Sequence, residues 1–188
     1  FGLNGKCVSF CHSTDSSVPE IFGRLVAAPT GGNGMGMELP KRKSNRLRCY
    51  DYKSPGYYFV TICTAGKRKL FWESEQLMDG RPFFSKAGMI VESCIREIPL
   101  HYPCVQVEQY NVMPNHVHII LRIVEGNTVP LSTVVGQLKQ SVSHMIGKSI
   151  WQKSYHDHVI RGEQDYLKIW NYVAYNHQKW KEDCFFEK

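Results

Sequence analysis

Two histidines one residue apart, His116 and His118, form the pattern in this chain that most directly suggests a metal site. They belong to the stretch NVMPNHVHIILRI, whose apolar residues alternate as in a β-strand. Because neighbouring side chains of a strand point to opposite faces, we expect both imidazoles to project from the same face. Two converging imidazoles can bind a divalent metal ion. The same spacing also fits two histidines on the wetter face of a half-buried sheet.

A second reactive pattern lies near the C-terminus, where Tyr172 and Asn176 are four residues apart. Apolar spacing predicts a helix over residues 163–179, with these two residues as neighbours on a face away from its buried stripe. Lys168 and Lys179 flank them. Lysines favour a phenolate and hold an anionic substrate, so Tyr172 is a candidate nucleophile for phosphate chemistry. Asn176 offers a carbonyl oxygen as a third metal ligand. The spacing also fits an ordinary surface tyrosine.

The segments that carry these residues predict an α+β fold. The stretch GYYFVTICT, after Pro55, is rich in aromatic and β-branched residues and predicts a first strand. The other expected elements are a helix over residues 85–98, a strand hairpin over residues 105–112 and 116–124, a helix over residues 131–147, an extended or irregular link over residues 151–160 and the C-terminal helix. This order predicts a ferredoxin-like sandwich, an antiparallel sheet with helices packed on one face. The histidines are then expected on the other, open face.

Length, composition and charge restrict the class of protein. The chain has 188 residues, of which 43% are hydrophobic, and a net charge of +6. These values suit one domain with a real core and permit a nucleic-acid partner. No apolar run is long enough to span a membrane, and the opening FGLNGKCVSFCH lacks the features of a signal peptide. The seven cysteines form no paired CxxC framework. Together these features predict a cytoplasmic protein with no membrane partner.

Residues 1–36 differ in character from the rest of the chain. They contain as many basic as acidic residues, so the net positive charge lies in residues 37–188. They end in PTGGNGMG and show no sustained strand or helix period. We expect a disordered or non-native N-terminal extension, such as upstream sequence translated from a misplaced start, before one domain over residues 37–188. The alternative is a genuine accessory arm.

Three blocks of this sequence resemble a known family. The segment PNHVHIIL, followed later by the helix with Tyr172 and Asn176, resembles the single-tyrosine transposases of the HUH class, named for His, a bulky apolar residue and His. The nearer resemblance is to the REP-associated tyrosine transposases. It rests on RLRCYDYKSPGYYFVTICT, NVMPNHVHIIL and IWQKSYHDHVIRGEQDYLKIWNYVAYN, and it runs from about Lys43 to the C-terminus.

The resemblance implies a fold, a cofactor and a reaction. Such enzymes have an antiparallel sheet, use a divalent ion, usually magnesium or manganese, and nick single-stranded DNA beside a hairpin. By position, Tyr172 corresponds to the nucleophile that stays joined to the 5′ end, and His116, His118 and Asn176 correspond to the metal ligands. Other single-tyrosine relatives have Gln at that last place, and many members of the nearer family have Pro where this chain has His177. The implied partner is single-stranded DNA with a hairpin, bound by a monomer or a homodimer.

Other charged residues are candidates for weaker roles. Arg46 and Arg48 belong to a basic lead-in that could run along DNA phosphates, although it also fits a solvated tail. Lys139, on the second predicted helix, is a further candidate for DNA contact, as are the lysines beside the tyrosine. A second HxH pair, His156 and His158, has no evident third ligand, so we expect it to serve structure.

Three other functions fit parts of the pattern. A replication initiator or relaxase shares the HUH pair, although such proteins often have longer chains and further domains. A domesticated relative would bind hairpin DNA without cutting it, and the intact Tyr172, His116 and His118 weigh against this. A metal-dependent hydrolase would use the histidines with an activated water. It would not need Tyr172, so substitution of this residue separates a hydrolase from a transposase.

Overall fold

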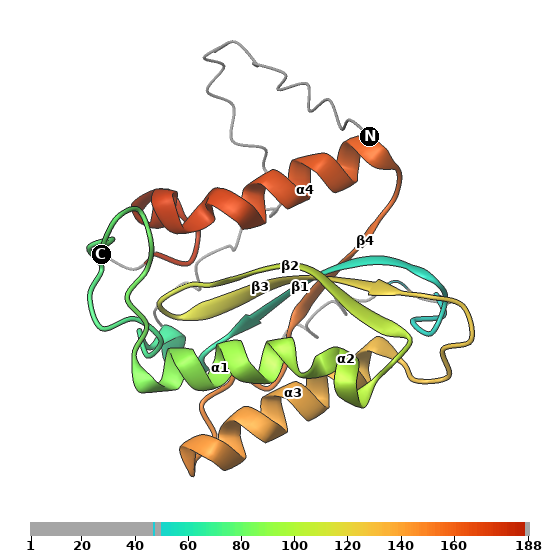
Figure 1. The fold of residues 1–188 in the computed structure, drawn as a ribbon, viewed down its shortest axis with the longest axis horizontal. Coiled ribbons are helices and arrows are strands. Elements are labelled where there is room, and N and C mark those ends of the chain that lie inside the picture. Colours follow the sequence, from blue (N-terminus) through green and yellow to red (C-terminus); the bar gives the residue numbers. More distant parts are fainter. Residues whose placement is uncertain (1–46, 48–49, 187–188) are drawn as a thin grey trace, which may run out of the picture. The chain divides into compact units, whose positions relative to one another are not determined.

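The fold is built on an antiparallel sheet of four strands. The structure, a computed structural model, describes residue 47 and residues 50–186. The strands are β1 (Gly56–Cys63), β2 (Val105–Val112), β3 (His116–Ile123) and β4 (His156–Ile160). Their order in the sheet is β2-β3-β1-β4, and every neighbouring pair is antiparallel (Figure 1). The α+β, ferredoxin-like class predicted from the order of elements is thereby confirmed.

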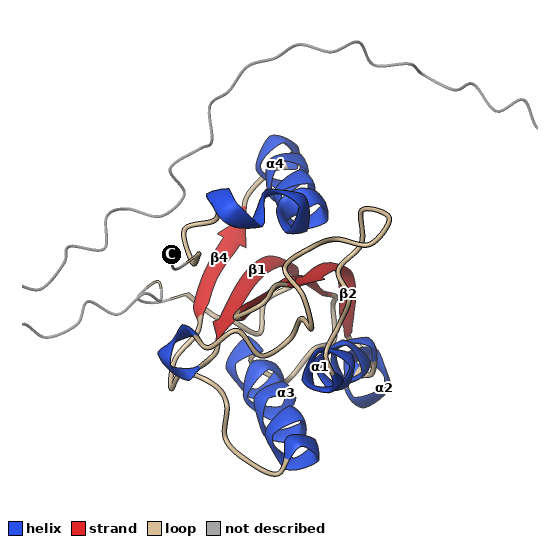
Figure 2. Cartoon of the chain, turned by 90° about the vertical axis from the view of Figure 1, so that its left-hand side faces the viewer, coloured by secondary structure: helices blue, strands red, loops and turns tan. Residues whose placement is uncertain are grey.

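Helices lie on both faces of this sheet (Figures 1 and 2). One face carries α1 (Lys86–Arg96), α2 (Ile98–His101) and α3 (Leu131–Ile146), and α4 (Glu163–Tyr175) crosses the other. Two short 3-10 helices, η1 (Ala65–Lys67) and η2 (Asn176–Glu182), follow β1 and α4. The first three helices match the expected packing on one face. The face expected to be open is instead covered by α4, which ends at Tyr175 and not at residue 179.

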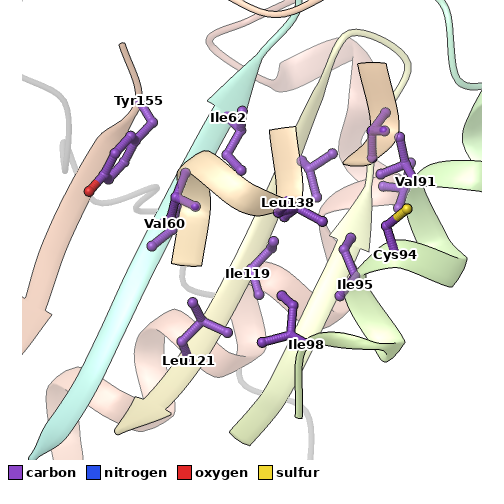
Figure 3. Packing of buried hydrophobic residues seen from close by; sticks show 14 of the residues in the cluster. Val60, Ile62, Val91, Cys94, Ile95, Ile98, Ile119, Leu121, Leu138 and Tyr155 are labelled. Carbon is purple, nitrogen blue, oxygen red and sulfur yellow. The ribbon is translucent and has the colours of Figure 1, made fainter. Parts of the chain in front are cut away.

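Strand alternation decides which side chains of β3 reach the main core. The four apolar residues that point toward α1 to α3 are each 1% exposed: Val117, Ile119, Leu121 and Ile123. Figure 3 shows Ile119 and Leu121 packed among side chains of β1, α1, α2 and α3. Since these residues are fixed in the core, the intervening histidines must point to the opposite face.

A smaller apolar layer lies under α4. Phe59 of β1 and Ile120 of β3 are opposite each other in the strand register, and both are buried. The buried side chains of α4 are Ile169 and Val173. Asn111 of β2 donates from Nδ2 to the Val173 carbonyl oxygen at 2.8 Å, which ties the helix directly to the sheet. This bond and the apolar layer fix α4 over the histidine face.

The sequence analysis expected an extended or irregular link over residues 151–160 and did not predict a strand of the sheet there, whereas the structure has β4. Its five residues, HDHVI, contain only two buried side chains, Val159 and Ile160. Among the described residues, β4 lies at an edge of the sheet and pairs with β1 alone. An edge strand is short and partly polar in many proteins, so its sequence pattern is weak. Long-range pairing with β1, not local sequence, defines this element.

Some sequence-based expectations fall outside the described residues. These are the N-terminal extension over residues 1–36 and the proposed DNA contacts Arg46 and Arg48, which stay predictions. Within residues 50–186, no helix combines the length and the apolar character that a membrane crossing requires.

Two glycines allow a matched test of the packing of α1. Gly88 lies in the first turn of α1, and a Cβ there would lie 2.1 Å from the Phe71 carbonyl oxygen. Gly88→Ala should therefore lower the free energy of unfolding by about 1–3 kcal/mol, because the backbone must shift. A Cβ at Gly136 in α3 meets no atom of the described residues within 4 Å. Gly136→Ala should therefore raise the free energy of unfolding by up to about 1 kcal/mol. Urea unfolding measures both, and equal effects would contradict this packing.

Candidate active site

His116 and His118 lie side by side at the start of β3, on the face covered by α4. Asn115 Oδ1 is 2.8 Å from His116 Nδ1, and an amide oxygen only accepts, so His116 carries its proton on Nδ1. Thr61 Oγ1 of β1 is 2.9 Å from His118 Nδ1. Because a hydroxyl accepts or donates, Thr61 allows His118 to carry its proton on either nitrogen. His118 Nε2 donates to the bare His116 Nε2 at 2.9 Å, and this proton must move to His118 Nδ1 before both Nε2 atoms can bind one ion.

Burial keeps both imidazoles neutral. Each side chain is 0% exposed. Burial lowers the pKa of His116 to about 3. Burial, and next the neighbouring His116, hold the pKa of His118 well below its usual value, against the opposing charge of Asp183. A neutral imidazole is the form that binds a metal ion, so at neutral pH the pair needs no deprotonation to bind one.

The hydroxyl of Tyr172 reaches this pair from α4. It lies 3.2 Å from His118 Nε2 and donates to Asp183 Oδ2 at 3.2 Å. Its ring packs edge-on against Phe59 with the ring centroids 6.1 Å apart, which fixes the side chain against β1. Asn176 donates from Nδ2 to the Tyr172 hydroxyl at 3.4 Å. The structure thus brings Tyr172 and Asn176 to the histidine pair, while their chemical roles stay predictions.

The surroundings of Tyr172 favour the protonated phenol. Burial, and then the negative charge of Asp183, raise the pKa of Tyr172 far above its usual value, while the hydrogen bond from Asn176 opposes this. The sequence analysis expected lysines to favour the phenolate. Lys168 and Lys179 are instead exposed on α4 and η2, and neither is among the groups that shift this pKa within the described chain. Neutralising the charge of Asp183 would therefore ease loss of the Tyr172 proton.

Asp183 is the member of the site that the sequence analysis missed. It follows η2 and is 9% exposed. Its Oδ1 accepts from the backbone nitrogen of Phe185 at 2.7 Å, and its Oδ2 accepts from Asn176 Nδ2 at 2.6 Å. The surrounding residues, KEDCFFEK, mix charges and aromatic residues without a helix or strand period. No local pattern distinguishes Asp183 from Glu182, which is exposed.

The donor atoms of the site fit a divalent cation. The candidate ligand atoms of His116, His118 and Asp183 all lie within 4.8 Å of one another. The two Nε2 atoms are 2.9 Å apart, and Asp183 Oδ2 is 4.0 Å from His116 Nε2. Two donors at about 2.1 Å from one octahedral ion lie about 3 Å apart when adjacent and about 4 Å apart when opposite. Two imidazoles and one carboxylate also leave positions for a substrate oxygen and water.

Asn176, the predicted third ligand, occupies the site in a different orientation. It is 5% exposed, and its amide nitrogen faces Asp183 and the Tyr172 hydroxyl. The carbonyl oxygen would face the same point after a half-turn of the amide. Since a carboxylate only accepts hydrogen bonds, the amide nitrogen must face Asp183 while that carboxylate is free. Ligation by Asn176 therefore requires that Asp183 take another partner.

Lys139, the lysine expected on the second helix, has hydrogen-bond partners within the protein, and its contact with DNA stays a prediction. Lys139 lies on α3, on the face of the sheet opposite the histidines (Figure 2). Its Nζ donates to the carbonyl oxygens of Gln152 and Lys153 at 2.7 and 3.1 Å. Burial lowers the pKa of Lys139. These contacts hold the link between α3 and β4 and place the ammonium group away from the site.

The C-terminal segment closes the site. The ring of Phe185 lies against His116, with the ring centroids 4.6 Å apart, and its carbonyl oxygen accepts from Asn115 Nδ2 at 2.9 Å. Trp180 of η2 adds a second ring, 6.1 Å from His116. The expectation that the histidines lie on an open face is therefore wrong. Both imidazoles are 0% exposed, so a substrate can reach them only after neighbouring side chains move.

Comparison with known proteins places this arrangement in a family. The family model described as "Transposase IS200 like" matches residues 56–176, from the first residue of β1 to Asn176. A protein of Haemophilus influenzae that is described as uncharacterized is 30% identical over 167 residues, which is 76% of this chain and 91% of the relative.

Two further proteins carry a more informative description. A REP-associated tyrosine transposase of Escherichia coli is 31% identical over 72 residues, covering 38% of this chain and 43% of the relative. A solved structure of a REP-associated tyrosine transposase bound to a REP hairpin is 23% identical and matches with a TM-score of 0.54, over 71% of this chain and 73% of that one. At this identity the structural match speaks for the fold alone.

Manganese should stabilise the folded protein through the histidine pair. At a concentration of Mn²⁺ 100 times its Kd, the gain is about 2.7 kcal/mol, which thermal melting detects. His116→Gln should lose this gain and, since His116 is buried, should also cost about 1–3 kcal/mol without metal. His158→Gln is the control, because His158 is part-exposed and pairs with Asp165 at 2.9 Å. An equal gain in His116→Gln would contradict the site.

The metal-free protein should lose stability as the pH falls below neutral. The pKa of His116 is about 3 in the folded protein and about 6.5 when unfolded, so between these values the unfolded chain binds more protons. The contribution of His116 to the free energy of unfolding is fully present above pH 6.5. It falls by about 1.4 kcal/mol per pH unit as the pH drops toward 3. Urea unfolding in chelator between pH 7 and 4 measures the slope. His116→Gln should show a shallower slope, and an unchanged one would contradict the assignment.

Proposed function

This chain belongs to the IS200-like transposase family, and we propose that it cuts and rejoins single-stranded DNA beside a hairpin through a tyrosine–DNA intermediate. The resemblance to REP-associated tyrosine transposases is confirmed by the family model, the Escherichia coli relative and the shared fold. The observation that carries the proposal is the position of the Tyr172 hydroxyl, 3.2 Å from His118 Nε2 within a buried cluster of polar side chains.

In the proposed reaction the Tyr172 oxygen attacks a backbone phosphorus. A bond forms between the phenolic oxygen and phosphorus, and the bond from phosphorus to the 3′ oxygen breaks. The phenol loses its proton, and the departing strand leaves as a 3′ hydroxyl. The other strand stays on Tyr172 through its 5′ phosphate. Because the phosphodiester energy is kept in the phosphotyrosine, attack by a 3′ hydroxyl can rejoin DNA without a nucleotide cofactor.

His116, His118 and Asp183 are the residues that we propose to hold magnesium or manganese. Such an ion would neutralise charge on the phosphate and polarise it. Asn115 and Thr61 orient the two imidazoles, and mutation of such supporting partners typically weakens a metal site. Asp183 also raises the pKa of Tyr172, so neutralising this carboxylate would favour loss of the phenol proton. Ligand binding and nucleophile activation would thus be linked through Asp183.

The proposed partner is a DNA hairpin with unpaired flanks. The net charge of +6 favours a polyanion. Lys168 is exposed on α4, the helix that carries Tyr172, and Lys179 is exposed on η2, which follows α4. Unpaired DNA can bend to present its phosphate to Tyr172, whereas each unstacked base of a duplex costs a few kcal/mol. Cutting should therefore be confined to single strands and should weaken as salt rises.

The burial of the histidines favours one alternative function. A relative that binds hairpins without cutting them would need no access to His116 and His118, which are 0% exposed here. The same protein surface would then serve recognition alone. Detection of a covalent protein–DNA species separates the two functions, because a binding protein forms none.

Tyr172→Phe should abolish covalent capture of DNA and leave binding nearly unchanged. The assay uses end-labelled single-stranded hairpin DNA from the sequence flanking the gene, with Mn²⁺, and a denaturing gel. Tyr175→Phe is the matched control, because Tyr175 lies on the same helix and is 53% exposed. The control should form the adduct at the wild-type level.

The same gel carries the tests that would overturn the proposal. An adduct that persists in Tyr172→Phe and disappears in Tyr175→Phe would move the nucleophile to Tyr175. Cutting without any adduct would favour a hydrolase with an activated water. Equal cutting of the same sequence as a duplex would favour a general nuclease.

A further inference from the structure

A recess lies beside the active site at the β2 edge of the sheet. Its volume is about 190 Å³. Gln109 and Asn111 of β2 line it. His177 of η2 and two residues of the loop before α1, Arg81 and Phe84, line it as well. β2 is an edge strand of the described sheet, so no strand within residues 50–186 covers the sheet beyond the recess.

The strand register places this recess one strand away from the proposed metal ligands. Asn111 is paired with His118, and Gln109 is paired with Ile120. Directly paired residues of an antiparallel sheet point to the same face, so both side chains face α4, as His118 does. Neighbouring strands are about 4.8 Å apart. A nucleotide next to one held at Tyr172 can therefore reach the recess.

Internal hydrogen bonds brace the walls of the recess. Asn111 Nδ2 lies 2.8 Å from the Val173 carbonyl oxygen and 3.0 Å from His177 Nδ1. Because Asn111 donates to Nδ1, His177 carries its proton on Nε2, and it also bonds to the backbone of Gly80. These bonds join β2, α4 and the turn before Arg81. A braced recess can select a ligand by shape, because little order is lost on binding.

Two of the lining residues, Arg81 and Gln109, have polar side chains that solvent can reach. Arg81 is exposed, and its backbone makes two hydrogen bonds of 2.9 Å with Met78 that hold the turn. Within residues 50–186, no ion pair is formed by the Arg81 guanidinium. Gln109 is partly exposed, and its Oε1 accepts from the backbone nitrogen of Tyr110 at 3.1 Å, so its amide group lies along the strand edge.

We propose that this recess binds one unpaired base next to the scissile phosphate, and that Arg81 and Gln109 read the identity of that base. The inference rests on the proposed function and adds a source of sequence preference. A guanidinium and an amide are the groups that pair with base edges, and a guanidinium also stacks on a base plane. At about 190 Å³ the recess is smaller than the pockets of about 300 Å³ and more that take drug-sized ligands, which suits one heterocyclic base and not a base pair.

The test measures base preference in binding, separately from cleavage. The probe is a synthetic hairpin from the sequence flanking the gene, with four randomised unpaired nucleotides on each side, bound to the full chain in chelator. Bound strands are sequenced. The wild type should enrich one base at one flanking position, and Arg81→Ala and Gln109→Ala should each reduce that preference roughly ten-fold. An abasic site at that position should weaken wild-type binding and leave Arg81→Ala nearly unaffected.

Arg161→Ala is the matched control. Arg161 is exposed at the end of β4, at the other edge of the sheet, and its loss removes the same charge. It should lower affinity through salt-dependent attraction alone and keep the base preference. Thermal melting should be unchanged in Arg81→Ala, because the side chain is exposed.

The outcomes separate the two proposals. A wild type that retains the hairpin without preference, or variants that keep the full preference, would overturn the recess as a base site and leave the proposed function standing. A wild type that does not retain the hairpin at all would overturn the proposed function as well.

Discussion

The histidines, Asn176 and Asp183 of the proposed site are buried and Tyr172 is partly buried, so these polar groups must find hydrogen-bond partners within the protein. The two imidazoles, the phenol, the amide and the carboxylate come from β3, α4, η2 and the segment after η2. A buried polar group without a partner costs about 1–3 kcal/mol, so these elements must pack together for the network to close. The position of α4 over the sheet, which decides where Tyr172 lies, follows from this requirement as much as from apolar contact.

If the proposed function holds, the same network would restrain the reaction until a cation binds. Asp183 accepts hydrogen bonds from the Tyr172 hydroxyl and from Asn176 Nδ2. Thr61 and Asn115 bond to the Nδ1 atoms of the histidines and orient the two imidazoles. A bound cation would coordinate Asp183 and the Nε2 atoms of His116 and His118 at the same time. Binding of the cation would then free the Tyr172 hydroxyl and the Asn176 amide from Asp183 in one step. The site would respond to the cation more abruptly than if each group were freed independently.

The sequence could predict those parts of the site that follow a local period. β3 alternates over eight residues, so the common direction of His116 and His118 follows from the core residues between them. The spacing of Tyr172 and Asn176 follows from helical geometry in the same way. Asp183 could not be predicted, because it reaches the site through the turn of the chain after η2. β4 likewise depends on pairing with β1, and the contacts of Lys139 depend on the path of the link that it holds.

The aromatic cover over the histidines supplies the protein with a built-in optical reporter. Trp180 is 3% exposed, lies 6.1 Å from His116, and has Lys69 Nζ 5.9 Å from its ring. The emission of an indole moves to longer wavelength when water reaches it, so displacement of the segment around Trp180 would be visible as a red shift. The difference between the wild type and Trp180→Phe isolates this signal from that of the other tryptophans. Access to the site can therefore be followed in solution by fluorescence alone, with no label on the protein or the DNA.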